Sequence, residues 1–426
     1  MKKKLSCALA MLLLATTVAG CGNTGGTSKE GAQSKADAKD SGGAPAQAGE
    51  MEPYRIGMIT QLTGANSYGG NEYKMGAEVA LELIGGEVNG RKVEMVFADG
   101  PSQEATIAEY ERLYNDDIRL FVSGYGCIAD RAIMPMSDQM EAVYLSAAWD
   151  ADLLQGTSDY FFRVGANITD FAKNVAALSS SIGDQYLNKK GSDLKVAVVY
   201  NTRLEHLNTV VKEEFDREGI QIVLDEGYPG DIKDFVPIIT KLKDLDYDIF
   251  IPIQGAADGI PFQQKIFEMG YRPPVTFGAG ILYDTPVFGD LGSEITDGVL
   301  TTSYPTAYIA EDGAKGIKEF REAFEKKAGH KPLTHALQGY GLVQIATKIL
   351  EQVPPEQWED TAKLAETTKA LNIPEGELAW YWGVKFEDNS NVLATQMVAN
   401  QWVNSDCLPV YPDNLKTSDA KVPWSE

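Results

Sequence analysis

The side chains that most often carry covalent or metal chemistry are scarce in this sequence. Its 426 residues contain four cysteines and three histidines, at positions 206, 330 and 335. No Cys-x-x-Cys pair, no His-Glu-x-x-His run and no Cys/His spacing typical of a metal site occurs. Because this is a thin supply for a hydrolase or a metalloenzyme, we expect a protein that performs no catalysis and holds no metal or cofactor.

One glycine-rich segment has residues suited to a dinucleotide. The sequence Gly-Tyr-Gly-Cys-Ile-Ala at 124–129 fits a loose G-x-G-x-x-A pattern, in which glycines let the backbone approach a pyrophosphate. That fingerprint belongs after the first strand of a sheet, with an acidic residue at the end of the next strand. Here the segment follows the third predicted strand, and no such acid follows. An oxidoreductase is therefore only a remote alternative.

Three loops that follow predicted strands combine small residues with aromatic ones, which favours binding over catalysis. The Gly/Ser/Asn-rich stretch 61–70 opens a helix, so its backbone N–H groups suit an anion such as a carboxylate, although a plain turn uses the same residues. Loops 123–127 and 146–150 offer close backbone approach, and rings that stack on a ligand, hold a cation or pack at a rim. The candidate binding residues from these loops are Tyr68, Tyr125, Gly126, Cys127, Ala147, Ala148 and Trp149.

Loops after a second series of strands supply the remaining candidates. Three acids that follow these strands, Glu205, Asp258 and Asp284, can each accept a ligand ammonium. Acids are also common at helix starts, because they complement the helix dipole. The candidate binding residues of this second series are Glu205, His206, Gln254, Gly255, Gly280 and Tyr283.

An alternation of short apolar strands and amphipathic helices must position these loops. Near-continuous apolar runs such as LKVAVVY and YDIFIPI are typical of parallel strands buried on both faces. The pattern predicts an α/β fold of two doubly wound lobes, separated by a helix-rich stretch at 170–187, with ligands at the carboxyl ends of the strands. Predicted strands span 54–60, 92–99, 119–124, 142–147, 194–200, 220–227, 247–253 and 274–278, with strand-like segments at 381–386 and 392–403. Predicted helices span 73–84, 103–115, 204–218, 234–245, 260–269, 314–328 and 334–353.

The N-terminus is predicted to be a targeting segment. Lysines at positions 2–4 precede an apolar run over 5–18, which is shorter than the roughly 20 residues needed to span a bilayer. The run ends in Val-Ala-Gly-Cys, which resembles the lipobox of bacterial lipoproteins. That resemblance implies a signal peptide over 1–20 and a lipid anchor on Cys21 in the cell membrane; the alternative is an ordinary signal peptide with a chance cysteine. We expect 21–52 to be a flexible linker, because residues 22–50 contain no aromatic, Leu, Ile or Val.

The net charge argues against one class of function, and the remaining cysteines raise the question of a disulfide. The formal net charge of −23 argues against nucleic-acid binding, which needs a Lys/Arg surface to neutralise phosphates. Once Cys7 and Cys21 are set aside, Cys127 and Cys407 remain. One disulfide between them fits an oxidising compartment, and we favour two free thiols.

Six segments over roughly 53–410 form a recognisable series: IGMITQLTG, GAEVALELIGGEVNGRKVEMVFAD, YFFRVGANITD, VAVVY, GYGLVQIATKIL and WGVKFEDNSN. Taken together, in this order, they resemble the type I solute-binding proteins of ABC transporters, in the leucine/isoleucine/valine-binding branch. The resemblance implies two lobes joined by a three-segment hinge, closure on a small molecule, and delivery of that molecule to an ABC permease by a monomer. We expect lobe 1 over 53–167 with about 300–375 returning to it, and lobe 2 over 168–299 with about 376–415 contributing.

The pocket departs from the pattern of that branch. There, hydroxyl side chains after the third strand and a Thr after the fourth hold the ligand carboxylate, and an acid on lobe 2 pairs with the ammonium. This chain has Tyr125 and Cys127 in the first place, Trp149 in the second and 278–280, Gly-Ala-Gly, in the third. We therefore expect an amino acid or a small aromatic or amide-type compound as ligand. A ligand sensor of the same fold, feeding a receptor or regulator, is the alternative to an importer component.

Overall fold

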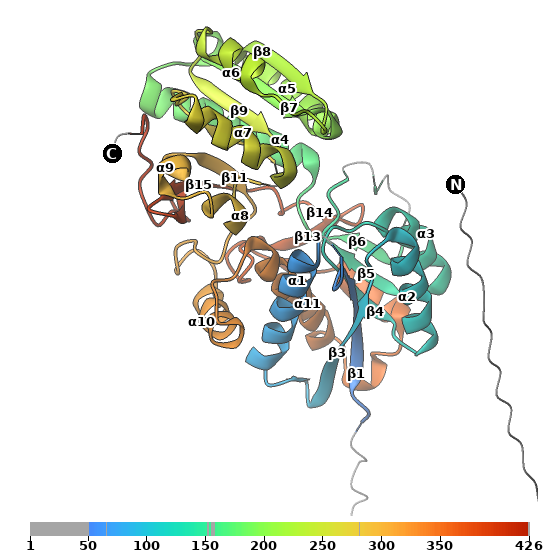
Figure 1. Cartoon of the computed structure of the whole chain (residues 1–426). Coiled ribbons are helices and arrows are strands. Elements are labelled where there is room, and N and C mark those ends of the chain that lie inside the picture. The colour runs from blue at the N-terminus through green and yellow to red at the C-terminus, as the bar shows by residue number, and fades with distance from the viewer. Residues whose placement is uncertain (1–50, 65, 151–152, 155–157, 281, 425–426) are drawn as a thin grey trace, which may run out of the picture. The chain divides into compact units, whose positions relative to one another are not determined.

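The structure is a computed structural model that describes residues 51–64, 66–150, 153–154, 158–280 and 282–424. The predicted signal peptide, Cys21 and nearly all of the predicted linker lie outside these residues. Residues 50–426 form one compact unit that contains two sheet systems (Figure 1). We call the nine-stranded sheet with its helices lobe 1, and the two smaller sheets with their helices lobe 2.

The sheet of lobe 1 has the strand order β12-β13-β14-β6-β5-β4-β1-β3-β2. Its centre, from β3 through β1, β4 and β5 to β6, is parallel, as the apolar strand sequences predict. The strands are β1 (Tyr54–Thr60), β2 (Glu87–Val88), β3 (Arg91–Asp99), β4 (Leu120–Ser123), β5 (Val143–Ser146), β6 (Phe161–Arg163), β12 (Asn372–Ile373), β13 (Val384–Glu387) and β14 (Ser390–Asn391).

The helices of lobe 1 include a tightly packed pair, α1 and α11, which come from opposite ends of the chain (Figure 1). A Cβ added to Gly76 of α1 would lie 1.9 Å from the backbone oxygen of Ala336, so the two helices can approach this closely only at glycine. The helices are α1 (Ser67–Leu83), α2 (Gln103–Asn115), α3 (Asp130–Met140), α10 (Ile317–Ala328), α11 (Thr334–Glu351) and α12 (Thr361–Lys369).

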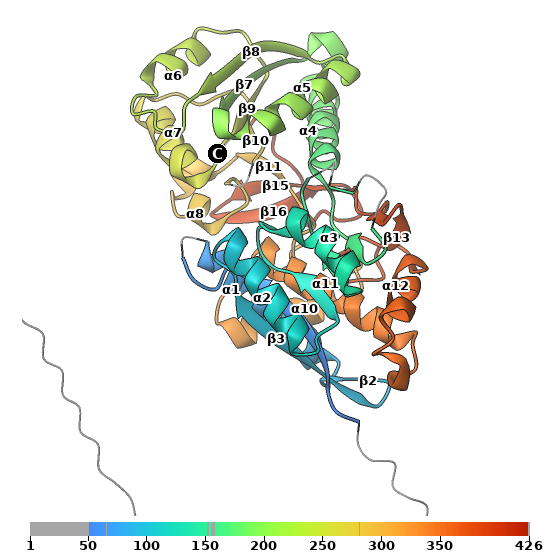
Figure 2. The same ribbon diagram turned by 90° about the vertical axis from the view of Figure 1, so that its right-hand side faces the viewer.

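Lobe 2 contains a parallel three-stranded sheet, β8-β7-β9, and a mixed four-stranded sheet, β10-β11-β15-β16. Two isolated bridges from β9, at Phe250 and Ile253, connect the sheets. In Figure 2 the strands β15 and β16 lie on the side of lobe 2 next to lobe 1. The strands are β7 (Lys195–Asn201), β8 (Gln221–Tyr228), β9 (Ile249–Ile253), β10 (Phe277–Gly278), β11 (Leu300–Ser303), β15 (Val398–Val403) and β16 (Asp406–Tyr411).

The helices of lobe 2 begin and end at residues that the sequence marks. Asn167 and Asp170 form a capping box at the start of α4, and Gly219 takes a left-handed conformation after α5. The helices are α4 (Ile168–Ile182), α5 (Glu205–Glu218), α6 (Val236–Lys243), α7 (Ala256–Glu268), α8 (Pro286–Gly289) and α9 (Ser293–Thr296).

Three segments of the chain cross between the lobes, between β6 and α4, between β11 and α10, and between β14 and β15. Two of the expected boundaries differ from this arrangement. β11 pairs with β10 and β15, so the chain leaves lobe 2 after residue 303 and not near 300. β13 and β14 extend the lobe 1 sheet through β6, so residues 376–391 belong to lobe 1 and not to lobe 2.

The first helix differs from the sequence prediction at its start. It begins at Ser67 and not at Tyr73, which places Tyr68 in its first turn. The glycines at 69 and 70 indicated a loop, but a Cβ on Gly70 would lie 2.0 Å from the backbone oxygen of Gln61. The glycine is needed for this contact, which outweighs its helix-propensity cost of about 1 kcal/mol. Among the residues described, no helix has the length and apolarity required to cross a bilayer.

Candidate ligand-binding site

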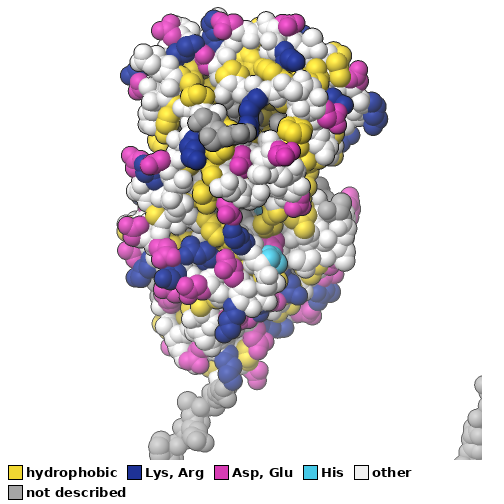
Figure 3. Space-filling view, turned by 60° about the vertical axis from the view of Figure 1, so that its left-hand side comes forward, with side chains coloured by type: hydrophobic (Ala, Val, Ile, Leu, Met, Phe, Trp, Pro, Cys, Tyr) yellow, Lys and Arg dark blue, Asp and Glu magenta, His cyan; other side chains and the backbone are white. Residues whose placement is uncertain are grey.

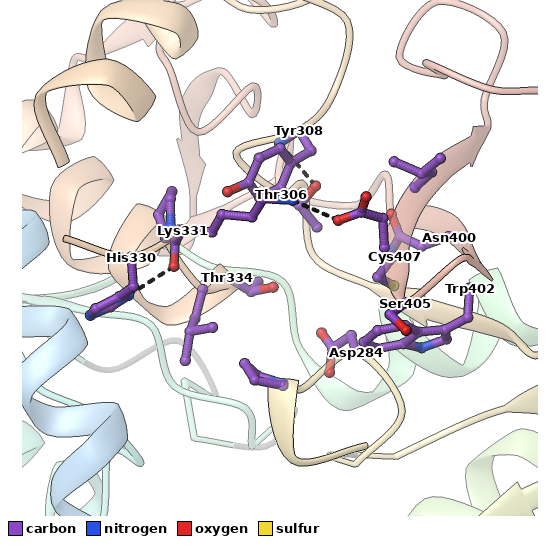
Figure 4. A pocket seen from close by; sticks show the side chains of 15 residues that line it. Asp284, Thr306, Tyr308, His330, Lys331, Thr334, Asn400, Trp402, Ser405 and Cys407 are labelled. Atoms are coloured by element: carbon purple, nitrogen blue, oxygen red, sulfur yellow. Dashed lines mark hydrogen bonds and ion pairs between the residues drawn. The ribbon is translucent and has the colours of Figure 1, made fainter. Parts of the chain in front are cut away.

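A cavity of about 580 Å³ lies between the two lobes. One wall is the loop before α11 in lobe 1, and the opposite wall is the loop after β10 together with the β15–β16 hairpin in lobe 2. The segment that crosses after β11 forms the back. Figure 4 shows the side chains of these elements pointing into one space. The lining residues are Asp284, Pro286, Thr306, Tyr308, His330, Lys331, Pro332, Leu333, Thr334, Asn400, Trp402, Ser405, Asp406, Cys407 and Leu408.

The basic side chains at the rim of this cavity are already paired with carboxylates. Lys331 Nζ lies 2.6 Å from Asp406 Oδ1, and we call this contact the rim ion pair. His330 Nε2 lies 3.5 Å from an oxygen of Glu72 in α1. On the face shown in Figure 3, acidic and basic side chains are interspersed in the same way. The lining of the cavity therefore offers a ligand no unpaired cation among the described residues.

Asp284 is the one lining carboxylate without a cationic partner among the described residues. It is half-buried in the loop after β10, and the hydroxyl of Thr334, the first residue of α11, hydrogen-bonds to it across the lobes. Burial disfavours the charged form and raises the pKa of the Asp284 carboxyl to about 6. A ligand cation beside Asp284 would stabilise the ionised carboxylate and offset the free-energy cost of its desolvation.

The hairpin wall of the cavity uses its own N–H donors internally. The indole Nε1 of Trp402 donates to the backbone oxygen of Tyr283 at 2.7 Å, and Nδ2 of Asn400 donates to Ser303 Oγ at 2.8 Å. Asn400 Oδ1 is buried and accepts no hydrogen bond from the described residues. Burial also raises the pKa of the Cys407 thiol, so that this side chain is a neutral part of the wall.

An aromatic cluster of lobe 1 adjoins the cavity through Thr334. The ring of His335 lies 4.7 Å from the ring of Tyr125, and the hydroxyls of Tyr68 and Tyr125 are 3.1 Å apart. Burial lowers the pKa of His335 to about 4, so its imidazole is neutral at pH 7. Burial is the main cause of the raised pKa of Tyr125, followed by the contact with Tyr68, and the Asp284 charge contributes to it. The structure thus brings together Tyr68 and Tyr125, two candidates from the sequence, and His335, which the sequence reasoning did not select; none of the three lines the cavity itself.

Four other predicted residues of lobe 1 meet in a separate, smaller hollow. Gly126, Cys127, Ala148 and Trp149 line this hollow of about 320 Å³, which we call the lobe 1 hollow and which no residue of lobe 2 lines. Trp149 packs on Phe171 at 5.1 Å between ring centroids and extends to within 6.1 Å of the Tyr304 ring, which belongs to the crossing after β11. Ala147 is buried next to Ala148.

The backbone donors of these loops are largely occupied by hydroxyl side chains of the strands beneath them. Tyr125 N donates to Thr60 Oγ1 at 3.0 Å, Ala147 N to Ser123 Oγ at 3.0 Å, and Ala148 N to Ser146 Oγ at 2.8 Å. Ser146 in turn donates to the carboxylate of Asp130, which also accepts from Tyr144 at 3.2 Å. Burial raises the pKa of Asp130 to about 7. The loops are therefore held by their own lobe rather than left open for an anion.

The candidates of lobe 2 fall into two groups, and the first of them requires a correction. Gln254 and Tyr283 are fully buried and bound to each other, since the Tyr283 hydroxyl donates to Gln254 Oε1 at 2.5 Å. Gln254 Nε2 donates to the Tyr228 hydroxyl at 2.7 Å, so neither side chain is free for a ligand. They were predicted because they follow strands, but their side chains point into the core of the lobe.

The other candidates of lobe 2 do not line the cavity. Glu205 and His206 are exposed in the first turn of α5, where an acid complements the helix dipole. Gly255 is the residue before α7, and Gly280 packs against the backbone of Gln254. Of the three acids considered from the sequence as ammonium partners, only Asp284 reaches the cavity. Asp258 is buried and accepts a hydrogen bond from Tyr228.

The arrangement of the lobes agrees with comparisons to known proteins. Residues 53–406 match the periplasmic binding protein family. The chain belongs to this family. It is 26% identical over 398 residues to Leu/Ile/Val-binding protein homolog 7 of Brucella suis biovar 1, an alignment that covers 90% of this chain and 96% of the relative. An extracytoplasmic location follows from membership of this family of periplasmic binding proteins.

Solved structures of the family share the fold at low sequence identity. The branched-chain amino acid transporter substrate-binding protein LivJ from Streptococcus pneumoniae, in complex with isoleucine, has a TM-score of 0.67 at 18% identity, covering 84% of this chain and 98% of that one. A solute-binding protein of an ABC transporter from Rhodopseudomonas palustris, in complex with 3,4-dihydroxybenzoic acid, has a TM-score of 0.65 at 19% identity, covering 83% and 95%. These matches confirm the two-lobed α/β fold of type I solute-binding proteins predicted from the sequence.

Cysteines and metal ligands complete the description of the site. Cys127 and Cys407 are free thiols on different lobes. Within the described part of the chain, no three His, Cys, Asp or Glu side chains are grouped so that they could hold a metal ion.

Proposed function

We propose that the protein captures a small organic solute in the cavity between its lobes and delivers it to the permease of an ABC importer. The observation that carries this proposal is that both lobes supply walls of the same cavity. A solute in that position contacts its full set of partners only when the lobes are together, so binding favours the closed state. The permease can then distinguish the loaded protein by its closed form.

The chemistry of the cavity suits a solute about the size of an amino acid or a small aromatic compound. Its volume lies within the range of small-molecule sites, and Pro286, Pro332, Leu333, Trp402 and Leu408 make most of its lining apolar. The relatives support this range: one is named for leucine, isoleucine and valine, and two solved structures hold isoleucine and 3,4-dihydroxybenzoic acid. We infer no catalysis, because the side chains around Asp284 include no activated nucleophile.

The place of action proposed is the outer side of the cell membrane, with a lipid on Cys21 as the anchor and 21–52 as the tether. The Val-Ala-Gly-Cys sequence supports this part of the proposal. Mass spectrometry of the protein from membranes tests it, because the lipid adds the mass of its acyl chains to a mature N-terminus at Cys21. A mature chain that begins elsewhere, with an unmodified thiol, contradicts the anchor.

A thermal-shift screen of the purified protein tests solute binding. The panel contains the proteinogenic amino acids, aromatic carboxylates, nucleobases, amides and amines. A solute at about 1,000 times its dissociation constant stabilises the folded state by roughly 4 kcal/mol, which raises the unfolding midpoint by several degrees. A clear shift with one chemical class supports the proposal, and the absence of a shift across the whole panel contradicts it. Transport assays in a strain lacking the protein separate the importer role from a sensor role.

A further inference from the structure

The hydrogen-bond donors and basic groups of the interlobe cavity are more fully paired within the protein than its acceptor groups. Its side-chain N–H donors, Trp402 Nε1 and Asn400 Nδ2, are consumed by protein oxygens, and its basic groups, Lys331 and His330, face carboxylates. Asp284 carries the one lining carboxylate without a cationic partner among the described residues, and it accepts from a backbone N–H and from the Thr334 hydroxyl; Asn400 Oδ1 accepts no hydrogen bond from the described residues. A cation that donates hydrogen bonds is therefore the polar group that this lining suits best.

The charges of the lining disfavour a ligand carboxylate in the same cavity. Asp284 would repel it, and the rim ion pair already satisfies the only lysine of the lining. The N–H groups of Tyr125, Ala147 and Ala148 on lobe 1 lie outside the lining of this cavity, and they are bonded to hydroxyls of their own strands. Asp284 would stabilise the ammonium of a zwitterionic amino acid, whereas its carboxylate would find no unpaired cation in the lining.

We propose that the solute is an organic amine with an apolar body and no carboxylate, held through its ammonium by Asp284. This inference rests on the proposed function and specifies the solute class of that same cavity. The ammonium donates to the Asp284 carboxylate, beside the hydroxyl of Thr334. The apolar body lies against Trp402, Leu333 and Leu408, where its burial supplies hydrophobic free energy.

Matched pairs of solutes that differ only in the carboxylate test this inference on the unaltered protein. Isothermal titration at pH 7.5 compares 3-methylbutylamine with leucine and 2-phenylethylamine with phenylalanine. We expect at least one amine to bind at least tenfold more tightly than its amino acid. An amino acid that binds as tightly as its amine, or the absence of binding by both amines, overturns the inference.

A pair of substitutions then tests the role of Asp284. Asp284→Asn keeps the shape of the side chain and removes its charge, and is expected to weaken amine binding at least tenfold. Asp290→Asn removes an exposed acid of the same lobe that does not line the cavity, and is expected to leave binding unchanged. Equal affinities in the two variants overturn the assignment, provided that the unfolding midpoint shows Asp284→Asn to be folded.

Failure of this inference is distinguishable from failure of the proposed function. If a neutral or anionic solute of the thermal-shift panel binds and the amines do not, the importer role stands and the amine assignment is overturned. If no solute of any class binds, both are overturned.

Discussion

Lys331 and Asp406 join the two lobes across the mouth of the cavity, with Lys331 Nζ 2.6 Å from Asp406 Oδ1. Lys331 belongs to the loop before α11 in lobe 1, and Asp406 is the first residue of β16 in lobe 2. Lys331 Nζ also lies 5.8 Å from the ring centroid of Tyr308, on the crossing segment. The contact ties the loop before α11 to the β15–β16 hairpin, which form opposite walls of the cavity.

Removing the rim ion pair is expected to weaken solute binding modestly. Both side chains are more than half exposed, and exposed ion pairs contribute about 0.2–1 kcal/mol, so Asp406→Asn should lower affinity by no more than about fivefold. Isothermal titration at low and high salt measures this, and the difference between variant and wild type should shrink as salt screens the pair. The charge-swapped double variant, Lys331→Asp with Asp406→Lys, should recover the loss. A charge-swapped variant that binds the solute no more tightly than Asp406→Asn contradicts an electrostatic contribution of the rim ion pair.

Trp149 distinguishes the interlobe cavity from the lobe 1 hollow. Trp149 does not line the interlobe cavity, so Trp149→Ala is expected to lower the affinity for a solute between the lobes less than about threefold. A solute stacked on the indole would instead lose at least about tenfold, since such ring contacts contribute about 0.5–1.5 kcal/mol beyond the buried area. Titration of the variant decides between these outcomes, and a tenfold loss would move the proposed site to the lobe 1 hollow.

Amine binding should depend on pH through Asp284. Its carboxyl has a pKa of about 6 in the unliganded protein and must be ionised to hold an ammonium. The affinity should therefore fall about tenfold between pH 7 and pH 5. The groups whose pKa values the Asp284 charge affects, Tyr125, Tyr304 and Cys407, have pKa values raised mainly by burial and stay neutral in this range. The rim ion pair and His330 lie at the mouth, so His330→Gln is the control.

The pH dependence of amine affinity is expected to disappear in one variant and to persist in the other. Asp284→Asn should show a weak affinity that does not change between pH 5 and pH 7, and His330→Gln should retain the wild-type slope. A profile that flattens in His330→Gln instead would assign the pH dependence to the rim.

Asp130 should make the protein less stable as pH rises. Its pKa is raised from 3.8 to about 7, mainly by burial, so between these values the folded state binds a proton that the unfolded state has released. The free energy of unfolding therefore decreases as pH rises from about 4 to 7. Urea unfolding at pH 5 and pH 8 measures this decrease, which should be smaller in Asp130→Asn. An unchanged difference between the two pH values would show that Asp130 titrates normally.

Much of the fold could be predicted from the sequence because its strands are nearly continuous apolar runs. β7 and β9 are almost wholly buried, and α2 spans 103–115 as predicted. The short strands β6, β12 and β14 were missed, because two or three residues carry no periodic signal. The pairing of Ser390 in β14 with Arg163 in β6, far away in the chain, decides that 376–391 belong to lobe 1.

The candidate site was predicted only in part, for a different physical reason. Placing candidates after strands selected Tyr125, which adjoins the cavity without lining it, and it also selected Gln254 and Tyr283, whose side chains turn inward to bond each other. Asn400 and Trp402 line the cavity from a hairpin whose second strand was not predicted. Whether these two residues line the cavity depends on how the lobes pack against each other, which local sequence periodicity does not reveal.

The two free cysteines allow the central claim, that the solute lies between the lobes, to be measured directly. Cys407 lines the interlobe cavity and Cys127 lines the lobe 1 hollow, and both are half-buried. Mass spectrometry can follow alkylation of each thiol by iodoacetamide, with and without the solute found by screening. The account predicts that the solute slows alkylation of Cys407 at least tenfold and leaves Cys127 nearly unchanged. Protection of Cys127 with Cys407 unaffected would contradict it.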